Sequence, residues 1–164
     1  MKKYLFKIFI LLLIFSNISC DQVSKNLVRN NIYPGDYIPV ISNHLILTNV
    51  ENTGAALGFG QNFSPVIKTI LLKGLPLLVL IVLTYRILSK KNLDKRLSIA
   101  FAFVIGGGMG NLIDRILYGS VTDFFHIQIG FFKTGIFNMA DVSVTIGILM
   151  VLTIALIQKK VKVP

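Results

Sequence analysis

The stretch LSIAFAFVIGGGMGNLIDR, residues 97–115, decides the fold of this chain. Residues 97–113 are predominantly apolar and long enough to cross a bilayer as a helix. Gly106 and Gly110 lie four residues apart within this run, and this spacing lets helix backbones approach closely inside membranes. The stretch therefore predicts a membrane-spanning helix that packs tightly against a neighbouring helix.

A polar stripe runs along the same predicted helix. Gly107, Asn111 and Arg115 recur every four residues, so they lie on one face. The glycine-rich run 106–110 has a superficial likeness to a phosphate-binding loop, but it lacks a preceding strand and a lysine-serine ending. We expect the stripe to lead from the apolar interior toward the charged end of the helix at Asp114.

The composition of the 164 residues extends this prediction to the whole chain. Hydrophobic residues make up 54% and charged residues 15%, and the mean hydropathy is +0.73, which is too apolar for a soluble domain of this size. We expect an all-α membrane protein of one domain, residues 1–164, built as a four-transmembrane-helix bundle. Pro76 predicts a kink in the second helix. The four apolar segments cover about 4–23, 66–85, 97–113 and 142–157.

Basic residues predict how the helices are oriented. The net charge is +10, but 11 of the 17 Lys and Arg residues fall in three clusters beside apolar segments. This bias orients membrane helices, so we expect no nucleic-acid partner. Both termini and the 86–96 connection are predicted to be cytoplasmic, with segments 24–65 and 114–141 on the other side. The clusters are Lys2, Lys3 and Lys7; Arg86, Lys90, Lys91, Lys95 and Arg96; and Lys159, Lys160 and Lys162.

The first outer segment contains two β-rich runs. Residues 37–41 and 45–50 are rich in Ile, Val and Leu, and they flank a short polar link at 42–44. This pattern predicts a hairpin or a small curled sheet. Because a two-stranded ribbon is marginally stable by itself, we expect it to rest on the helix ends or on the bilayer surface.

Acidic side chains gather at the predicted outer ends of the helices. Ionisable groups at this depth are costly and usually face a bundle interior or a polar cavity, so four distant positions are predicted to converge on one face of the bundle. They are Asp21 at the end of the first helix, Asp114 at the end of the third, Asp123 in the loop beyond it, and Asp141 at the start of the fourth.

Two of these acids also have an ordinary structural interpretation. Asp141 follows a candidate Asn138 cap by three residues, and an acid suits the positive end of a helix dipole. Asp123 follows Ser120-Val121-Thr122, where it would be a solvated loop acid. These interpretations stay open beside the functional one.

The other two acids have structural interpretations that involve a basic neighbour. Asp114 and Arg115 would form an interfacial charge pair. Asp21 opposes the dipole at its predicted helix end and so needs a partner. Lys25, four residues further on, supplies one.

The remaining chemistry-bearing residues are few. Cys20 is the single cysteine, which excludes an internal disulfide and a multi-cysteine metal site. His44 and His126 each lie far from a second metal ligand, and zinc-protease motifs are absent. Neither Ser-x-x-Lys nor Gly-x-Ser-x-Gly occurs. A pair of carboxylates remains for hydrolytic chemistry, and we expect no metal and no cofactor.

Five short blocks resemble, in order and spacing, the signature blocks of lipoprotein signal peptidase, also called signal peptidase II. The resemblance spans nearly the whole chain. The blocks are DQVSK at 21–25, NTGAA at 52–56, GGGMGNLIDR at 106–115, VTDF at 121–124 and FNMAD at 137–141.

The resemblance implies an aspartic endopeptidase embedded in the bacterial inner (cytoplasmic) membrane. Such enzymes remove signal peptides from prolipoproteins on the N-terminal side of a diacylglyceryl-modified cysteine. The partners implied are these lipid-modified signal peptides and membrane lipids, with the active site at the outer leaflet, and we expect a monomer. By the resemblance the catalytic pair is Asp123 and Asp141. Supporting positions are Asp21, Lys25, Asn52, Gly54, Gly107, Asn111, Arg115, Asn138 and Ala140.

The family's fold also implies a small extracytoplasmic β-cradle, which fits the region 37–50, and a short periplasmic helix near 54–62. Two other functions remain as alternatives: a small polytopic transporter or channel subunit with charges lining a pathway, and a non-enzymatic assembly factor or lipoprotein with four spans. Ion flux without peptide cleavage would favour the transporter.

The stretch Asn17-Ile18-Ser19-Cys20 follows a charged start and an apolar run, a pattern typical of a lipoprotein signal peptide. Asn17 stands where such a signal prefers an apolar residue. Cleavage before Cys20 would also remove the first helix, so we expect the N-terminus to be retained and Cys20 to carry no lipid.

Overall fold

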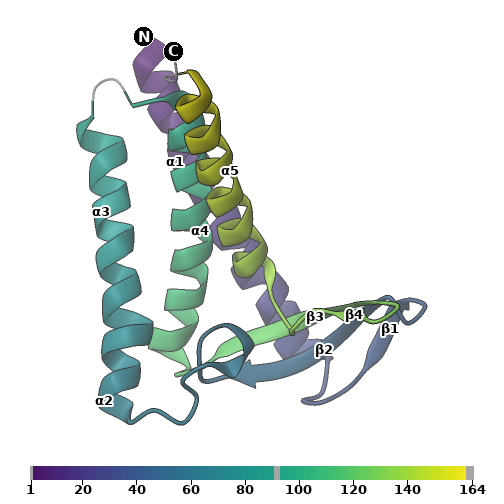
Figure 1. The fold of residues 1–164 in the computed structure, drawn as a ribbon. Helices are drawn as coiled ribbons and strands as arrows, with labels where there is room; N and C mark the ends of the chain where they lie inside the picture. The colour runs from purple at the N-terminus through teal and green to yellow at the C-terminus, as the bar shows by residue number, and fades with distance from the viewer. Residues whose placement is uncertain (1, 91–92, 162–164) are drawn as a thin grey trace.

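Four long helices form the body of the protein (Figure 1). The computed structural model describes residues 2–90 and 93–161. Within these residues four helices are long and apolar enough to cross a membrane, as predicted. They are α1 (Lys2–Asn31); a second span through α2 (Pro65–Lys68), the π-helical segment η2 (Thr69–Gly74) and α3 (Leu75–Ser89); α4 (Lys95–Leu117); and α5 (Met139–Val161).

Helix α4 lies at the centre of the bundle, where it packs against α1, α3 and α5 (Figure 1). Of its most apolar stretch 56% is buried inside the protein, against 22% or less for the other spans, so those helices leave most of their apolar surface outside. The predicted close packing at glycine is confirmed. A Cβ on Gly106 would lie 2.6 Å from Cβ of Asn17 in α1, and one on Gly110 would collide with the Asp21 carboxylate.

The start of α1 and the end of α5 lie at one end of the bundle. A four-stranded antiparallel sheet lies at the opposite end (Figure 1). The hairpin predicted at 37–41 and 45–50 is confirmed by the first two strands. Segment 114–141, which was expected to be a connection, forms the other two. The strands, in sheet order, are β1 (Ile38–Ile41), β2 (Leu45–Asn52), β3 (Val121–Ile129) and β4 (Phe132–Lys133).

Helix α1 continues to Asn31, well past its predicted end near residue 23. The apolar run stops there, but Asp21, Lys25 and Arg29 recur every four residues and form a polar stripe against the rest of the protein. Asp21 and Lys25 are fully buried, and their ion pair of 2.8 Å confirms the predicted partner. Asp21 therefore lies inside a helix rather than at its end, and the pairing compensates for burial instead of for an opposed dipole.

The other spans also exceed their apolar cores at both ends, and polar caps lie at their starts. The Asp94 side chain accepts a hydrogen bond from the backbone N–H of Arg96 at the start of α4. The second span, predicted at 66–85, runs from Pro65 to Ser89. The third, predicted at 97–113, runs from Lys95 to Leu117, and the fourth, predicted at 142–157, runs from Met139 to Val161.

At Pro76, where the sequence predicts a kink, the π-helical segment η2 ends just before the first turn of α3. Proline has no N–H for the carbonyl four residues earlier, at Leu72. A π-helical turn is one way in which a helix accommodates such an interruption.

The short helix implied near 54–62 is reduced, in the part of the chain that the structure describes, to one 3-10 turn, η1 (Ala56–Gly58). Gly58 and Gly60 have φ of 73° and 77°, in the left-handed region that a right-handed helix cannot include. The segment is therefore an irregular loop that follows β2.

Candidate active site

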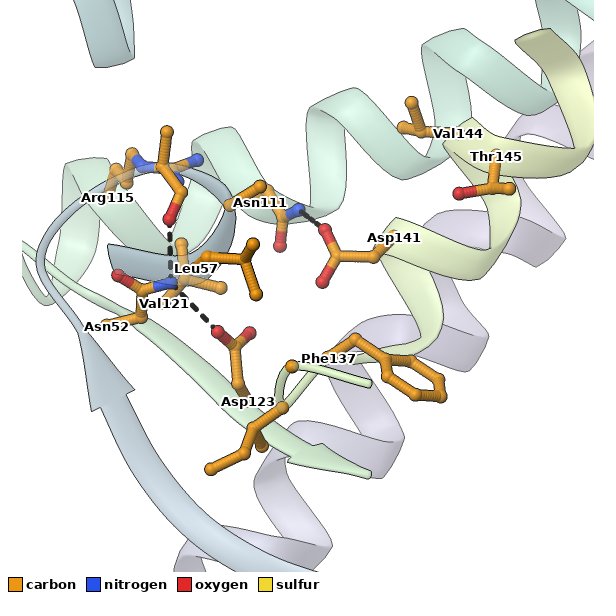
Figure 2. A pocket seen from close by; sticks show the side chains of 14 residues that line it. Asn52, Leu57, Asn111, Arg115, Val121, Asp123, Phe137, Asp141, Val144 and Thr145 are labelled. Atoms are coloured by element: carbon orange, nitrogen blue, oxygen red, sulfur yellow. Dashed lines mark hydrogen bonds between the residues drawn. The ribbon is translucent and has the colours of Figure 1, made fainter. Parts of the chain in front are cut away.

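A pocket of about 410 Å³ opens between α4, the start of α5, the sheet and the loop after β2 (Figure 2). Five predicted site residues line it: Asn52, Asn111, Arg115, Asp123 and Asp141. Apolar side chains cover much of the remaining wall, among them Leu57, Ile136, Phe137 and Val144. Two acids thus share one largely apolar cavity.

Asp123 lies on β3 and not, as the sequence suggested, in a loop. Only 5% of it is exposed, which excludes the interpretation as a solvated loop acid. Its Oδ1 accepts a hydrogen bond of 2.6 Å from Nδ2 of Asn138, and its Oδ2 accepts one of 3.0 Å from Nδ2 of Asn52. The carboxylate is therefore held by two amide donors.

Asp141 lies in the first turn of α5, and the predicted Asn138 cap is confirmed. The backbone N–H of Asp141 donates to Oδ1 of Asn138 at 3.0 Å, and the backbone N–H of Asn138 donates to Oδ2 of Asp141 at 3.1 Å. This reciprocal pattern is a capping box. Asp141 also accepts a hydrogen bond of 2.8 Å from Nδ2 of Asn111 (Figure 2), so one acid serves both as a cap and as a wall of the pocket.

Asn111 has its amide orientation fixed by Lys25. Its Oδ1 accepts hydrogen bonds from Nζ of Lys25 at 2.9 Å and from Nδ2 of Asn138 at 3.1 Å. Because both neighbours are donors, the oxygen of Asn111 must face them and its NH2 group must face Asp141. The predicted stripe on α4 therefore reaches the acids as expected.

The environment of Asp123 favours its protonated form. Burial raises the pKa of Asp123 to about 6, and the neighbouring charge of Asp141 raises it as well. The hydrogen bonds from Asn52 and Asn138 oppose this change because they stabilise the carboxylate. The two acids of the pocket are thus placed so that one holds its proton more tightly than an isolated carboxyl group does.

Arg115 does not pair with Asp114, contrary to the predicted interfacial charge pair. One of its terminal nitrogens donates to the carbonyl oxygen of Gly54 at 2.8 Å. Asn52 shapes the same turn, since its Oδ1 accepts from the backbone N–H of Gly54 at 2.9 Å and its Nδ2 donates to the carbonyl of Ala55 at 3.0 Å. Arg115 therefore ties the loop after β2 to α4.

Glycine is required at two of the predicted positions because of close backbone approaches. A Cβ on Gly54 would lie 2.6 Å from the carbonyl oxygen of Phe59, and a Cβ on Gly107 would collide with the carbonyl oxygen of Ala140. Gly54 thus lets the loop fold back on itself. Gly107 lets the start of α5 lie directly against α4.

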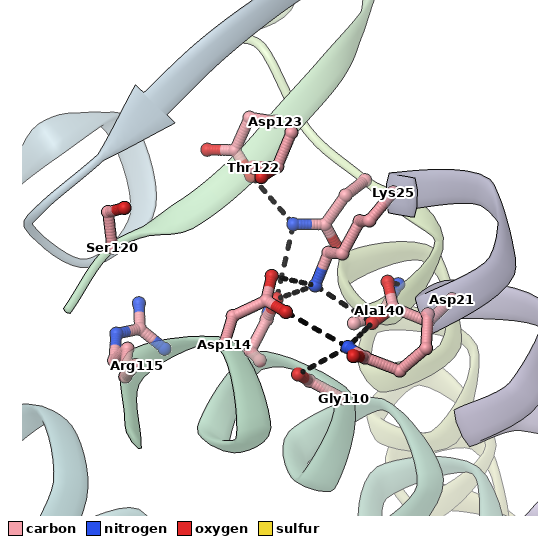
Figure 3. A network of polar contacts seen from close by, with 12 residues as sticks. Asp21, Lys25, Gly110, Asp114, Arg115, Ser120, Thr122, Asp123 and Ala140 are labelled. Atoms are coloured by element: carbon pink, nitrogen blue, oxygen red, sulfur yellow. Dashed lines mark hydrogen bonds and ion pairs between the residues drawn. The ribbon is translucent and has the colours of Figure 1, made fainter. Parts of the chain in front are cut away.

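A second polar cluster lies behind the pocket, between α1 and α4 (Figure 3). Nζ of Lys25 lies 2.8 Å from Asp21 and 3.0 Å from Asp114, and all three side chains are fully buried. Oδ1 of Asp21 accepts a hydrogen bond of 2.9 Å from the backbone N–H of Ala140. Buried charges need such partners, and this pairing anchors α5 beside the pocket.

Sequence reasoning assigned no role to four residues that contact this cluster, and it paired Asp114 with Arg115 rather than with Lys25 and Arg29. Nε2 of Gln22 donates to Oδ1 of Asp114 at 3.0 Å. The four-residue spacing of Asp21, Lys25 and Arg29 was the signal that α1 continues and that Arg29 belongs with them. The strand positions carried no such signal. The four are Gln22, Arg29, Glu51 and Thr122.

Comparison with known proteins gives a consistent result along most of the chain. The model of the signal peptidase (SPase) II family, Peptidase_A8, matches residues 13–157. The lipoprotein signal peptidase of Moorella thermoacetica is 37% identical over 142 residues, which cover 85% of this chain and 87% of that protein. The lipoprotein signal peptidase of Bacillus pumilus is 34% identical over 145 residues, covering 87% and 88%.

Two solved structures, each described as a bacterial membrane enzyme obtained by the in meso method, have the same fold. One superposes with a TM-score of 0.84 at 30% identity and covers 94% of this chain and 92% of its own. The other has a TM-score of 0.78 at 31% identity and covers 90% and 92%. These relatives favour the peptidase interpretation over the transporter and assembly-factor alternatives.

Proposed function

Because the chain belongs to the signal peptidase II family, we propose that it cleaves bacterial prolipoproteins with Asp123 and Asp141 as an aspartic catalytic pair. The single observation that carries the proposal is the placement of two carboxylates on one pocket, with Asn138 bonded to both. Asn52 and Asn111 also donate to these acids, and Lys25 donates to Asn111.

The chemistry follows from two neighbouring carboxyl groups that share one proton. Two such groups cannot both ionise easily, so one keeps its proton while the other acts as a base. The base takes a proton from water as the water oxygen attacks the peptide carbonyl carbon, and the acid polarises the carbonyl oxygen. The C–N bond then breaks, and the departing amine takes up the proton that the base received from water.

The amide side chains supply the fixed geometry that this reaction needs. Asn52 and Asn138 donate to Asp123, and Asn111 donates to Asp141. Each of the three amides has further partners that fix its orientation, so the donors are in place before substrate arrives. Arg115 adds a positive charge to the same wall.

The substrate class we propose is a prolipoprotein signal peptide, cut on the N-terminal side of its diacylglyceryl-modified cysteine. The apolar wall formed by Leu57, Ile136, Phe137 and Val144 suits a segment that arrives from the hydrocarbon region. The pocket is lined by residues of two spans, α4 and α5, and of the sheet (Figure 2).

In the arrangement proposed, the protein spans the inner membrane with both termini in the cytoplasm and the pocket at the outer leaflet, and it acts as a monomer. The basic residues at 86–96 support this orientation by their charge. The start of α1 and the end of α5 lie together, away from the sheet (Figure 1).

The test is cleavage of a synthetic diacylglyceryl prolipoprotein peptide by the purified full chain in detergent. Asp123→Asn and Asp141→Asn should each abolish cleavage, because neither variant has two titratable acids in the pocket. Asp36→Asn is the matched control, since Asp36 is an exposed acid in the turn before β1. It should retain full activity. Full activity in either pocket variant, with the fold verified by thermal unfolding, would refute the catalytic pair.

A further inference from the structure

We propose that Arg29, Glu51 and Thr122 form a positioning cluster that holds the strand of Asp123 in place against α1 and α4, the helices that contact the start of α5, where Asp141 lies. The proposal rests on the catalytic pair proposed above and extends it to residues outside the pocket. None of the three lines the pocket, so the cluster acts on the reaction through its neighbours.

The cluster lies on the back of the strands whose front carries two pocket residues. Glu51 precedes Asn52 on β2, and Thr122 precedes Asp123 on β3; the register pairs Glu51 directly with Thr122. Adjacent residues of a strand point to opposite faces. A shift of this pair therefore moves Asn52 and Asp123 by the same amount on the other side.

Thr122 is the centre of the cluster. It is fully buried, and its hydroxyl makes two short bonds: Oγ1 accepts from Nε of Arg29 at 2.7 Å and donates to Oε1 of Glu51 at 2.6 Å. Ser120 donates to the other oxygen of Glu51. A buried hydroxyl with one donor and one acceptor in fixed places has a single favourable orientation, so it fixes the strand pair to α1.

Arg29 connects this strand pair to the helices. Its guanidinium lies 3.1 Å from Oδ2 of Asp114 on α4 and 4.1 Å from the ring centre of Tyr118, just after that helix ends. Only 20% of its side chain is exposed. The planar fork of an arginine presents several nitrogens in fixed directions, and here one nitrogen donates a hydrogen bond to Thr122 of β3 while another makes an ion pair with Asp114 of α4.

A continuous chain of polar contacts then reaches the second acid. Asp114 pairs with Lys25, Lys25 donates to Asn111, and Asn111 donates to Asp141. Figure 3 shows Thr122, Lys25 and Asp114 grouped on the side of β3 that faces α1 and α4. The two acids are thus linked twice, in front by Asn138 and behind by the positioning cluster. The two paths meet at Asn111, whose side-chain oxygen accepts hydrogen bonds from both Asn138 and Lys25.

The decisive substitution is Thr122→Val, which removes the hydroxyl but keeps the size and β-branching of the side chain. We expect kcat to fall about tenfold with KM little changed, since a small misplacement of a catalytic group lowers the rate strongly. The pH profile of kcat/KM should contain a limb that reports the titration of Asp123. We also expect this limb to move relative to wild type. Loss of folded protein alone would not shift that limb.

Thr122→Ser is the rescue variant, because it restores the hydroxyl; it should recover most of kcat and the wild-type pH limb. Thr153→Val is the matched control, since the Thr153 hydroxyl bonds only to Leu149 of its own helix, at 2.8 Å. It should leave kcat unchanged. If Thr122→Val does not fold, Glu51→Gln serves instead: Glu51 is 45% exposed, and loss of its charge should shift the limb in a folded protein.

Wild-type kcat and an unshifted pH limb in folded Thr122→Val would overturn the inference. The same result for Glu51→Gln would do so if Thr122→Val cannot be folded. These outcomes differ from failure of the proposed function, which would show as activity that survives Asp123→Asn or Asp141→Asn.

Discussion

Asn138 is the residue on which the two acids depend most directly. Its side chain donates to Asp123, its backbone N–H donates to Asp141, and its side-chain oxygen caps α5. It is fully buried, so water cannot replace any of these bonds. Asn138 therefore connects the two carboxyl groups. Because it also caps the first turn of α5, the position of Asp141 relative to Asn138, and so to Asp123, is fixed by that turn.

Removal of the amide at Asn52 should change the pH dependence in a defined direction. Asn52 donates to Asp123 and lowers its pKa. In Asn52→Ala the pKa of Asp123 should therefore rise above about 6, and the limb of the pH profile of kcat/KM that reports this acid should move to higher pH. The measurement is cleavage of the lipopeptide across the pH range.

Asn49→Ala is the control for this shift. Asn49 also lies buried on β2, but its side chain donates to the carbonyl of Ile32 at 2.8 Å rather than to an acid. Its profile should keep the wild-type limbs. A profile of Asn52→Ala that is unshifted, or that moves to lower pH, would contradict the role given to this amide.

At the residue scale, the sequence was informative wherever a residue type and a spacing coincided. The Asn138 cap, the stripe of Asn111 and the Lys25 partner of Asp21 follow from helical periodicity. The predicted partner of Arg115, Asp114, was wrong. Arg115 binds Gly54, which is distant in sequence and offers only a backbone carbonyl. No side-chain pattern encodes such a contact.

At the scale of elements, the contact of α1 with α4 depends on a missing side chain. A Cβ on Gly110 would collide with the carboxylate of Asp21, which Lys25 and the backbone of Ala140 hold in place. The carboxylate cannot move without breaking buried ionic contacts. The two helices can approach closely only while residue 110 is glycine.

Gly110→Ala should therefore destabilise the protein by about 1–3 kcal/mol, as overpacking of a filled site usually does, and lower its melting temperature in detergent. Gly74→Ala is the matched control: a Cβ there would meet nothing closer than 3.6 Å, and alanine is the better helix former. The prediction fails if Gly110→Ala melts at or above the wild-type temperature.

The missed strands show why some elements are hidden in the sequence. Strand β3 begins with four buried residues, Val121 to Phe124, so polar and apolar residues do not alternate there as they do in a half-exposed strand. An aspartate in the middle further lowers its strand propensity. By contrast, β1 and β2 are marked by β-rich runs on both sides of a turn.

For the molecule as a whole, the four apolar segments and their basic flanks predicted the spans, because the thickness of a bilayer limits the length of a helix and lysine avoids its interior. The predicted end of α1 was wrong, because Asp21 and Lys25 beyond the apolar run are buried against protein rather than exposed. The assembly around the pocket was predicted only through the resemblance to a family.

The whole first span should remain on the mature protein. Ile10 is buried, and Asn17 bonds to Ser143 of α5, so residues before Cys20 belong to the packed bundle. Intact-mass measurement of protein purified from its native membrane should give the full chain with an unmodified Cys20. A mass lacking residues 1–19, or a lipid adduct on Cys20, would contradict this expectation.

The contribution of α5 to the pocket has a consequence for biosynthesis. Asp141 leaves the ribosome after Asp123, and the start of α5 that carries it is held against earlier spans by Asp21, which accepts from Ala140, and by Asn111, which donates to Asp141. Under the proposed mechanism, a nascent chain that has inserted three spans carries one acid and cannot hydrolyse anything. Under this mechanism the protein becomes active only when the last span has inserted, and partly inserted chains do not cleave peptides.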